Sequence, residues 1–157
     1  MHYTLLVLAD DMDEVERLMA PYQENNMDDV PREYLKFFDF SDETWHDEET
    51  GNEGCWENPD AKWDCYEFGG RWDRCITTKD GRHVSSCPVA EIDASKTWAK
   101  DGVPFSTYAV LTPDGEWHDS GTLDHDGMAY KAWRDSFAGD YIEPYLDKTA
   151  YLIDYHI

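Results

Sequence analysis

Basic side chains are scarce in this chain of 157 residues, which has 13 Lys and Arg against 35 Asp and Glu and a formal net charge of −22. Proteins bind nucleic acids and anionic membranes mainly through Lys and Arg, which displace counterions from phosphates. The shortage therefore argues against direct binding to either. A surface of this sign attracts basic surfaces, and many of those in a cell are built to hold nucleic acid.

Long apolar runs are also missing, since none approaches the ~18 residues that a membrane-spanning helix needs. The first eight residues have neither a basic start nor a small-residue cleavage site, so we expect a soluble protein in the cytoplasm. Disorder is not expected for most of the chain, because aromatic residues make up 15% of it.

Closely spaced cysteines are absent. Cys55, Cys65, Cys75 and Cys87 lie at least ten positions apart, whereas a structural zinc site usually contains a pair two to four residues apart. Without an export signal, the sequence predicts reduced and mostly buried thiols. We expect no metal and no cofactor.

The apolar pattern predicts a single α+β domain over residues 1–157, with a mainly antiparallel sheet and helices largely on one face. Residues 3–9 are a continuous apolar run, which is typical of a central strand. Residues 12–20 and 128–145 repeat apolar side chains at helical spacing, and residues 149–157 alternate as a closing strand.

Turn sequences predict two hairpins, around Lys79-Asp80-Gly81 and around Pro113-Asp114-Gly115. Residues 22–60 are expected to form an acidic helical or loop insertion, with a helix at 32–38 because Pro31 suits a first helical position. Residues 41–60 have few apolar anchors, which leaves open whether they fold or remain a mobile arm.

Five ordered segments together carry a resemblance. They are HYTLLVLADD at the start, LMAPYQENN, NPDAKWDCYEFGGRW, YAVLTPDGEW and the terminal IDYHI. This set resembles a widespread family of small phage and mobile-element proteins, most of them uncharacterised, with Cys65 and Phe68 standing where the family tends to have Trp and Ile. The resemblance covers about half the chain and implies a mobile-element origin. Accessory proteins of such elements often disarm host defence, some of them by imitating the charge of duplex DNA.

The acidic residues are concentrated. Residues 10–60 hold 18 acids but only Arg17, Arg32 and Lys36, which gives this stretch 15 of the 22 net negative charges. A solvated surface or adaptation to salt also produces acidic chains, although salt adaptation should acidify the whole surface. Fixed carboxylates at regular spacing would instead imitate the phosphates of duplex DNA.

The first hypothesis is therefore a non-enzymatic inhibitor of anti-CRISPR or anti-restriction type, whose acidic face blocks the nucleic-acid channel of a basic host defence protein. It makes no direct contact with nucleic acid or membrane. The expected partner-binding residues are Asp28, Asp29, Glu33, Asp39, Asp42, Glu43, Trp45, Asp47, Glu48, Glu49, Glu53 and Trp56.

The second hypothesis is a small-molecule binder or hydrolase that uses Asp64 and Arg71 together with the terminal His2, Asp154 and His156. His2 begins a strand that could pair with the last one, where Asp154 and His156 share a face. In the Gly69-Gly70-Arg71-Trp72 segment, Arg71 could grip a phosphate or carboxylate while an indole stacks on a ring, which would suit a nucleotide. The structural alternative, which we favour for this segment, is a glycine bulge with Asp64 paired to Arg71. A virion or assembly component remains a third hypothesis.

Overall fold

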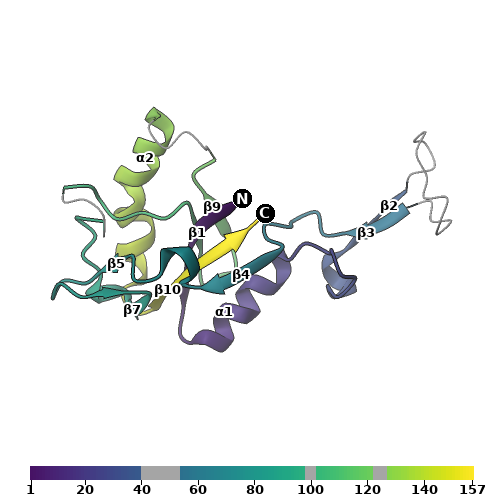
Figure 1. Ribbon diagram of the computed structural model, residues 1–157, viewed down its shortest axis with the longest axis horizontal. Helices are drawn as coiled ribbons and strands as arrows, with labels where there is room; N and C mark the ends of the chain where they lie inside the picture. The colour runs from purple at the N-terminus through teal and green to yellow at the C-terminus, as the bar shows by residue number, and fades with distance from the viewer. Residues whose placement is uncertain (40–53, 98–101, 122–126) are drawn as a thin grey trace.

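The structure is a computed structural model that describes residues 1–39, 54–97, 102–121 and 127–157 (Figure 1). Its main sheet has the strand order β4-β10-β1-β8-β9, and β7 also pairs with β10. Only the pair of β1 with β8 is parallel. The predicted α+β class and mainly antiparallel sheet are confirmed. The strands of this sheet are β1 (His2–Ala9), β4 (Cys65–Phe68), β7 (Ser86–Pro88), β8 (Ala109–Leu111), β9 (Trp117–Asp119) and β10 (Thr149–His156).

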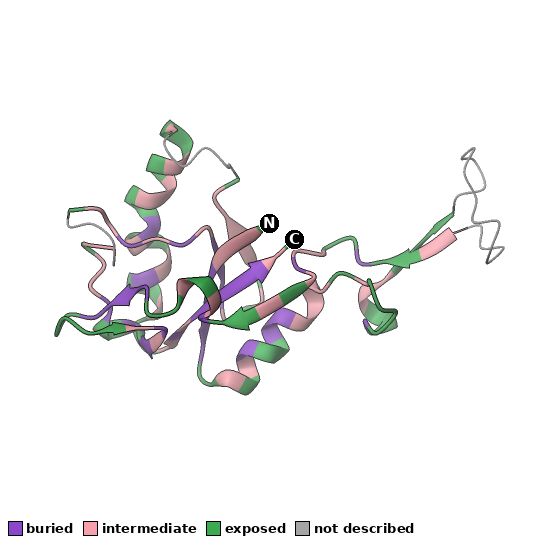
Figure 2. Ribbon diagram, in the orientation of Figure 1, coloured by how far each residue is buried: buried purple, intermediate pink, exposed green. Residues whose placement is uncertain are grey.

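Strands β1 and β10 form the centre of the molecule and pair along their whole length, from His2 opposite His156 to Ala9 opposite Thr149. Both ends of the chain therefore lie side by side (Figure 1). Residues 5–9 of β1 are completely buried, as the apolar run predicts for a central strand. Figure 2 shows the burial concentrated in these central strands.

The two α-helices pack against opposite faces of the sheet, and not on one face as expected. Helix α1 (Met12–Met19) begins at Asp11, whose carboxylate accepts the Glu14 N–H, and it packs on the side of Leu5. Helix α2 (Met128–Phe137) packs Phe137 on the side of Leu6 and continues as a π-helical turn (Ala138–Ile142) and a 3-10 turn (Glu143–Tyr145). Because residues 5–9 of β1 are all apolar, both faces of the strand present apolar side chains and need a cover. None of the described helices has the length and apolar character that crossing a membrane requires.

The remaining strands form two small hairpins: β2 (Lys36–Asp39) with β3 (Gly54–Glu57), and β5 (Ile76–Thr77) with β6 (His83–Val84). The β5–β6 and β8–β9 hairpins confirm the two predicted turns. The other 3-10 helices are Ala20–Tyr22, Arg32–Tyr34, Gly70–Trp72 and Val89–Glu91.

The helix expected at residues 32–38 is wrong. A single 3-10 turn ends at Tyr34, and the chain then extends into β2. There Phe37 lies opposite Trp56, with 5.5 Å between the ring centroids. Aromatic pairs across strands stabilise a two-stranded sheet, and this pairing outweighs the local helix signal. The β2–β3 hairpin extends away from the body of the molecule (Figure 1).

Candidate ligand site at the paired histidines

Strand register brings two histidines together at one end of the central sheet. His2 of β1 and Cys65 of β4 are both register partners of His156 in β10. Residues directly opposite each other in antiparallel strands share a face, so the three side chains lie in one row. The imidazole rings of His2 and His156 meet edge to face, with 4.9 Å between centroids. The predicted pairing of the terminal strands is thus confirmed.

Asp154 lies behind His2 and is only 4% exposed. Its Oδ1 is 2.8 Å from Nδ1 of His2, and its Oδ2 accepts the backbone N–H of Arg71 at 2.9 Å. Because an ionised carboxylate only accepts hydrogen bonds, the contact favours the His2 tautomer with its proton on Nδ1. Nε2 of His2 then has a free lone pair, and it has no partner among the described residues.

Asp64 forms the second pair, with both carboxylate oxygens 2.8 and 2.9 Å from Nδ1 of His156. The Asp64 N–H also donates to the His156 carbonyl at 2.9 Å. Burial alone would raise the pKa of Asp64, but hydrogen bonds from His156 and Cys65 outweigh it and hold that pKa below its usual value. Nε2 of His156 lies 2.9 Å from the nitrogen of Met1, so both of its ring nitrogens are engaged.

The Gly69-Gly70 pair brings the backbone against Asp154. Both glycines have positive φ, 70° and 50°, a region that L side chains rarely adopt. A Cβ on Gly70 would lie 2.5 Å from Cβ of Asp154. The expected Asp64–Arg71 pair is wrong, since Asp64 contacts His156. Arg71 contributes its backbone N–H to Asp154, while its side chain is exposed.

Replacing Gly70 by alanine is expected to destabilise the fold by about 1–3 kcal/mol more than Gly81→Ala does. Both positions have positive φ, but nothing lies within 4 Å of a Cβ at Gly81, so the control contains the backbone strain without the clash. Urea unfolding of the two variants measures the difference. Equal losses of unfolding free energy in the two variants would show that the clash of the new Cβ with Asp154 does not destabilise the fold.

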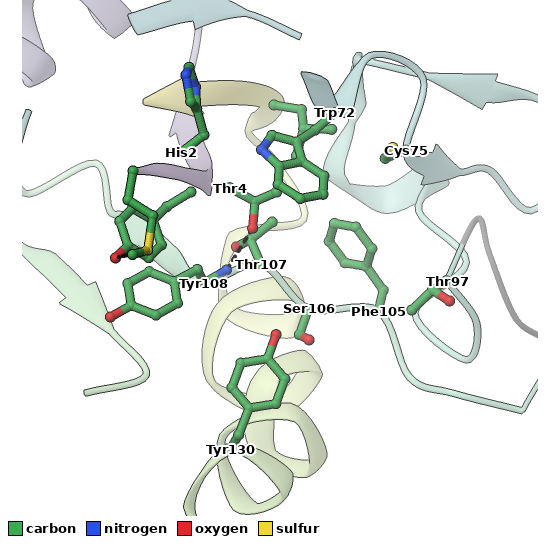
Figure 3. Close-up of a pocket in the computed structure, with 13 residues that line it drawn as sticks. His2, Thr4, Trp72, Cys75, Thr97, Phe105, Ser106, Thr107, Tyr108 and Tyr130 are labelled. Atoms are coloured by element: carbon green, nitrogen blue, oxygen red, sulfur yellow. Dashed lines mark hydrogen bonds between the residues drawn. The ribbon is translucent and has the colours of Figure 1, made fainter. Parts of the chain in front are cut away.

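A pocket of about 620 Å³ opens beside His2 (Figure 3). It lies between the N-terminal end of β1, residues 105–108 and helix α2. The described residues that line it include no Asp, Glu, Lys or Arg. The lining residues are Met1, His2, Tyr3, Thr4, Trp72, Cys75, Thr97, Phe105, Ser106, Thr107, Tyr108, Tyr130 and Leu152.

Trp72 lines this pocket, as an indole stacking on a ligand would require. Trp63 is buried and donates its Nε1–H to the Met19 carbonyl at 3.1 Å, so it belongs to the core under α1. No sequence pattern indicates Phe105, Ser106 or Tyr130 as site residues, because they come together only through contacts between distant segments.

Asp64, Cys65 and His156 could hold a metal ion, since one ligand atom from each lies within 4.8 Å of the others. Carboxylate, thiolate and imidazole are all zinc ligands. Cys65 does not resemble an activated nucleophile: burial, followed by its hydrogen bond to Asp64, raises the pKa of its thiol.

The residues expected to bind a partner divide into two groups. Asp28, Asp29, Glu33, Asp39 and Trp56 lie on or beside the β2–β3 hairpin and are all exposed. The others fall outside the residues that the structure describes: Asp42, Glu43, Trp45, Asp47, Glu48, Glu49 and Glu53.

The hairpin also presents large apolar side chains to solvent. Phe37, Phe38 and Trp56 are 53%, 41% and 39% exposed, and the guanidinium of Arg32 stacks 4.1 Å from the Trp56 ring centre. Exposed aromatics grouped in this way are typical of protein-binding surfaces.

Comparison with known proteins identifies no relative: no family model, no curated protein and no solved structure matches this chain.

Proposed function

We propose that the protein binds a small molecule beside His2 and uses the His2–Asp154 pair to accept a proton or hydrogen bond from it. One observation carries the proposal: His2 lines a 620 Å³ pocket and is fixed through Nδ1 by a buried carboxylate, while its Nε2 has no partner among the described residues. Pockets of this size with a few converging polar groups are the usual form of ligand sites.

The pair has the arrangement that general-base catalysis requires. A carboxylate that accepts from Nδ1 fixes the imidazole orientation and stabilises the imidazolium that forms when Nε2 takes a proton. Asp154 is itself fixed by the Arg71 N–H, so this support is rigid. The reaction class supported is proton transfer from a bound molecule, including a hydrolase step in which His2 activates water.

A fragment screen by thermal shift tests this proposal, with His2→Asn as the variant. Asparagine can keep the donor to Asp154 but lacks the Nε2 acceptor, so hits should bind the variant at least about tenfold more weakly, a loss of roughly 1.4 kcal/mol. A ligand at 100 times its Kd stabilises the fold by about 2.7 kcal/mol, which is readily measured. His83→Asn is the control, because exposed His83 lies outside the pocket. Hits with the same affinity for both variants would contradict the proposal.

A second candidate function is supported by the exposed hairpin. We propose that the β2–β3 hairpin engages a basic nucleic-acid-binding protein of host defence, as an inhibitor from a phage or mobile element acting in the host cytoplasm. Its support is the combination of exposed Phe37, Phe38 and Trp56 with flanking carboxylates on an extended arm. Aromatic anchors provide affinity, and complementary charge accelerates association. The resemblance to mobile-element proteins is consistent with this function.

A further inference from the structure

We infer that the ligand of the pocket beside His2 is an uncharged, planar aromatic molecule with a hydroxyl or N–H group that donates to Nε2 of His2. The inference rests on the ligand site proposed above and specifies its substrate class. It replaces the nucleotide suggested by the sequence, because Arg71 does not line the pocket.

The composition of the pocket lining argues against an anionic ligand. Asp, Glu, Lys and Arg make up 31% of the chain, so thirteen residues chosen by composition alone would include about four of them. Among the described residues, the lining contains none. A phosphate or carboxylate that entered the pocket would therefore lose its hydration without meeting a cation. This desolvation would cost on the order of several kcal/mol of binding free energy. The net charge of −22 repels anions further.

A cationic ligand is disfavoured for a related reason. No carboxylate of the described part of the chain lines the pocket, and Asp154 is already occupied by His2 and Arg71. Aromatic faces attract cations, but by less than a buried ammonium loses on desolvation without a counterion. An uncharged ligand avoids both losses.

The walls of the pocket supply the aromatic complement. In Figure 3, Trp72 and Phe105 lie on one side, Tyr108 on the other and Tyr130 below them on α2. Aromatic side chains prefer offset or edge-to-face contacts with other rings, which a planar ligand provides. Small hydroxyl side chains at Thr4 and Ser106 leave space between the rings.

The indole nitrogen of Trp72 supplies a second polar feature. This nitrogen is buried and has no acceptor among the described residues, and Figure 3 shows it on the side of the ring that faces His2 and Thr4. An unpaired buried N–H costs about 1–3 kcal/mol. A heteroaromatic ligand with an acceptor atom would satisfy it when the indole turns slightly into the pocket, while the ligand's own donor binds His2.

The experiment compares probes that share one ring and differ in charge. Indole-3-methanol, indole-3-acetate and tryptamine are neutral, anionic and cationic at pH 7, and adenosine with its monophosphate forms a second matched set. Calorimetry and thermal shift should show the neutral member of at least one set binding at least tenfold more tightly than its charged partners. His2→Asn should weaken that binding at least tenfold.

Pocket variants make the result specific. Ser106→Trp should fill the space and abolish binding. Tyr130→Ala should weaken binding by removing one wall, and it provides the test in case Ser106→Trp does not fold. Tyr34→Ala is the matched control, because Tyr34 lies outside the pocket.

The outcomes separate the inference from the proposed function. Tighter binding of an anion or cation that still depends on His2 would overturn the ligand class and leave the ligand site standing. Binding that is insensitive to His2→Asn and to the pocket variants would overturn both. Failure of every neutral probe to bind saturably would overturn the inference, while the wider fragment screen would decide on the site.

Discussion

Replacing Asp154 by asparagine is expected to weaken ligand binding at the His2 pocket by about 10- to 100-fold while the protein remains folded. A hydrogen bond to a charged group contributes roughly 1.5–3 kcal/mol, which corresponds to that range. The asparagine amide could still accept the Arg71 N–H, but its NH₂ group would then face Nδ1 of His2. His2 would change to the tautomer with its proton on Nε2 and lose the lone pair that the ligand needs.

The histidine tautomer gives this prediction a readout that a purely structural role would not change. ¹⁵N spectra of labelled protein distinguish protonated from unprotonated ring nitrogens, and the His2 signals should exchange roles in Asp154→Asn. Asp93→Asn is the control, because Asp93 binds Ser95 and Lys96 away from the pocket. An unchanged tautomer with unchanged affinity would show that Asp154 does not orient His2.

Elements with a local cause could be predicted from the sequence. Asp11 caps α1, the apolar run of residues 3–9 forms β1, and Gly115 allows the turn of the β8–β9 hairpin. Strand β2 could not be predicted in this way. Its conformation depends on Phe37 meeting Trp56 from β3, and such a pairing leaves no periodic signal in a four-residue segment.

In the candidate site, too, some residues could be placed from the sequence and others could not. His2, Asp154 and His156 could be placed together because they lie at the ends of strands that were expected to pair. The partner of Asp64 could not be predicted, because the choice between Arg71 and His156 depends on the register of β4 against β10.

The pocket was beyond prediction for a different reason. Thr4, Trp72, Phe105 and Tyr130 come from four separate segments, and α2 reaches the site only because it covers the face of the sheet opposite α1. A prediction that places both helices on one face of the sheet therefore cannot lead to this pocket, which needs α2 on the other face.

Shortening the hairpin is expected to abolish binding to a basic partner without affecting the ligand pocket. Phe37 and Trp56 are register partners, so Asn-Gly in place of residues 38–55 joins them through a two-residue turn. The change removes seven acids and no Lys or Arg, but keeps Trp56 with its contacts to Asn25 and Arg32. Because β2 and β3 pair with no other strand in the described part of the chain, the shortened chain should fold, with little change in Tm.

Inhibition of purified DNA- and RNA-cleaving host defence enzymes measures the effect. The full chain should inhibit at least one of them, more strongly at low salt than at high salt because the charges involved are exposed. The shortened chain should lose at least tenfold in potency, and His2→Asn should lose none. Equal potency of the full and shortened chains would place the interface elsewhere. Inhibition that is indifferent to salt would exclude charge imitation, since carboxylates that replace phosphates must compete with the same counterions.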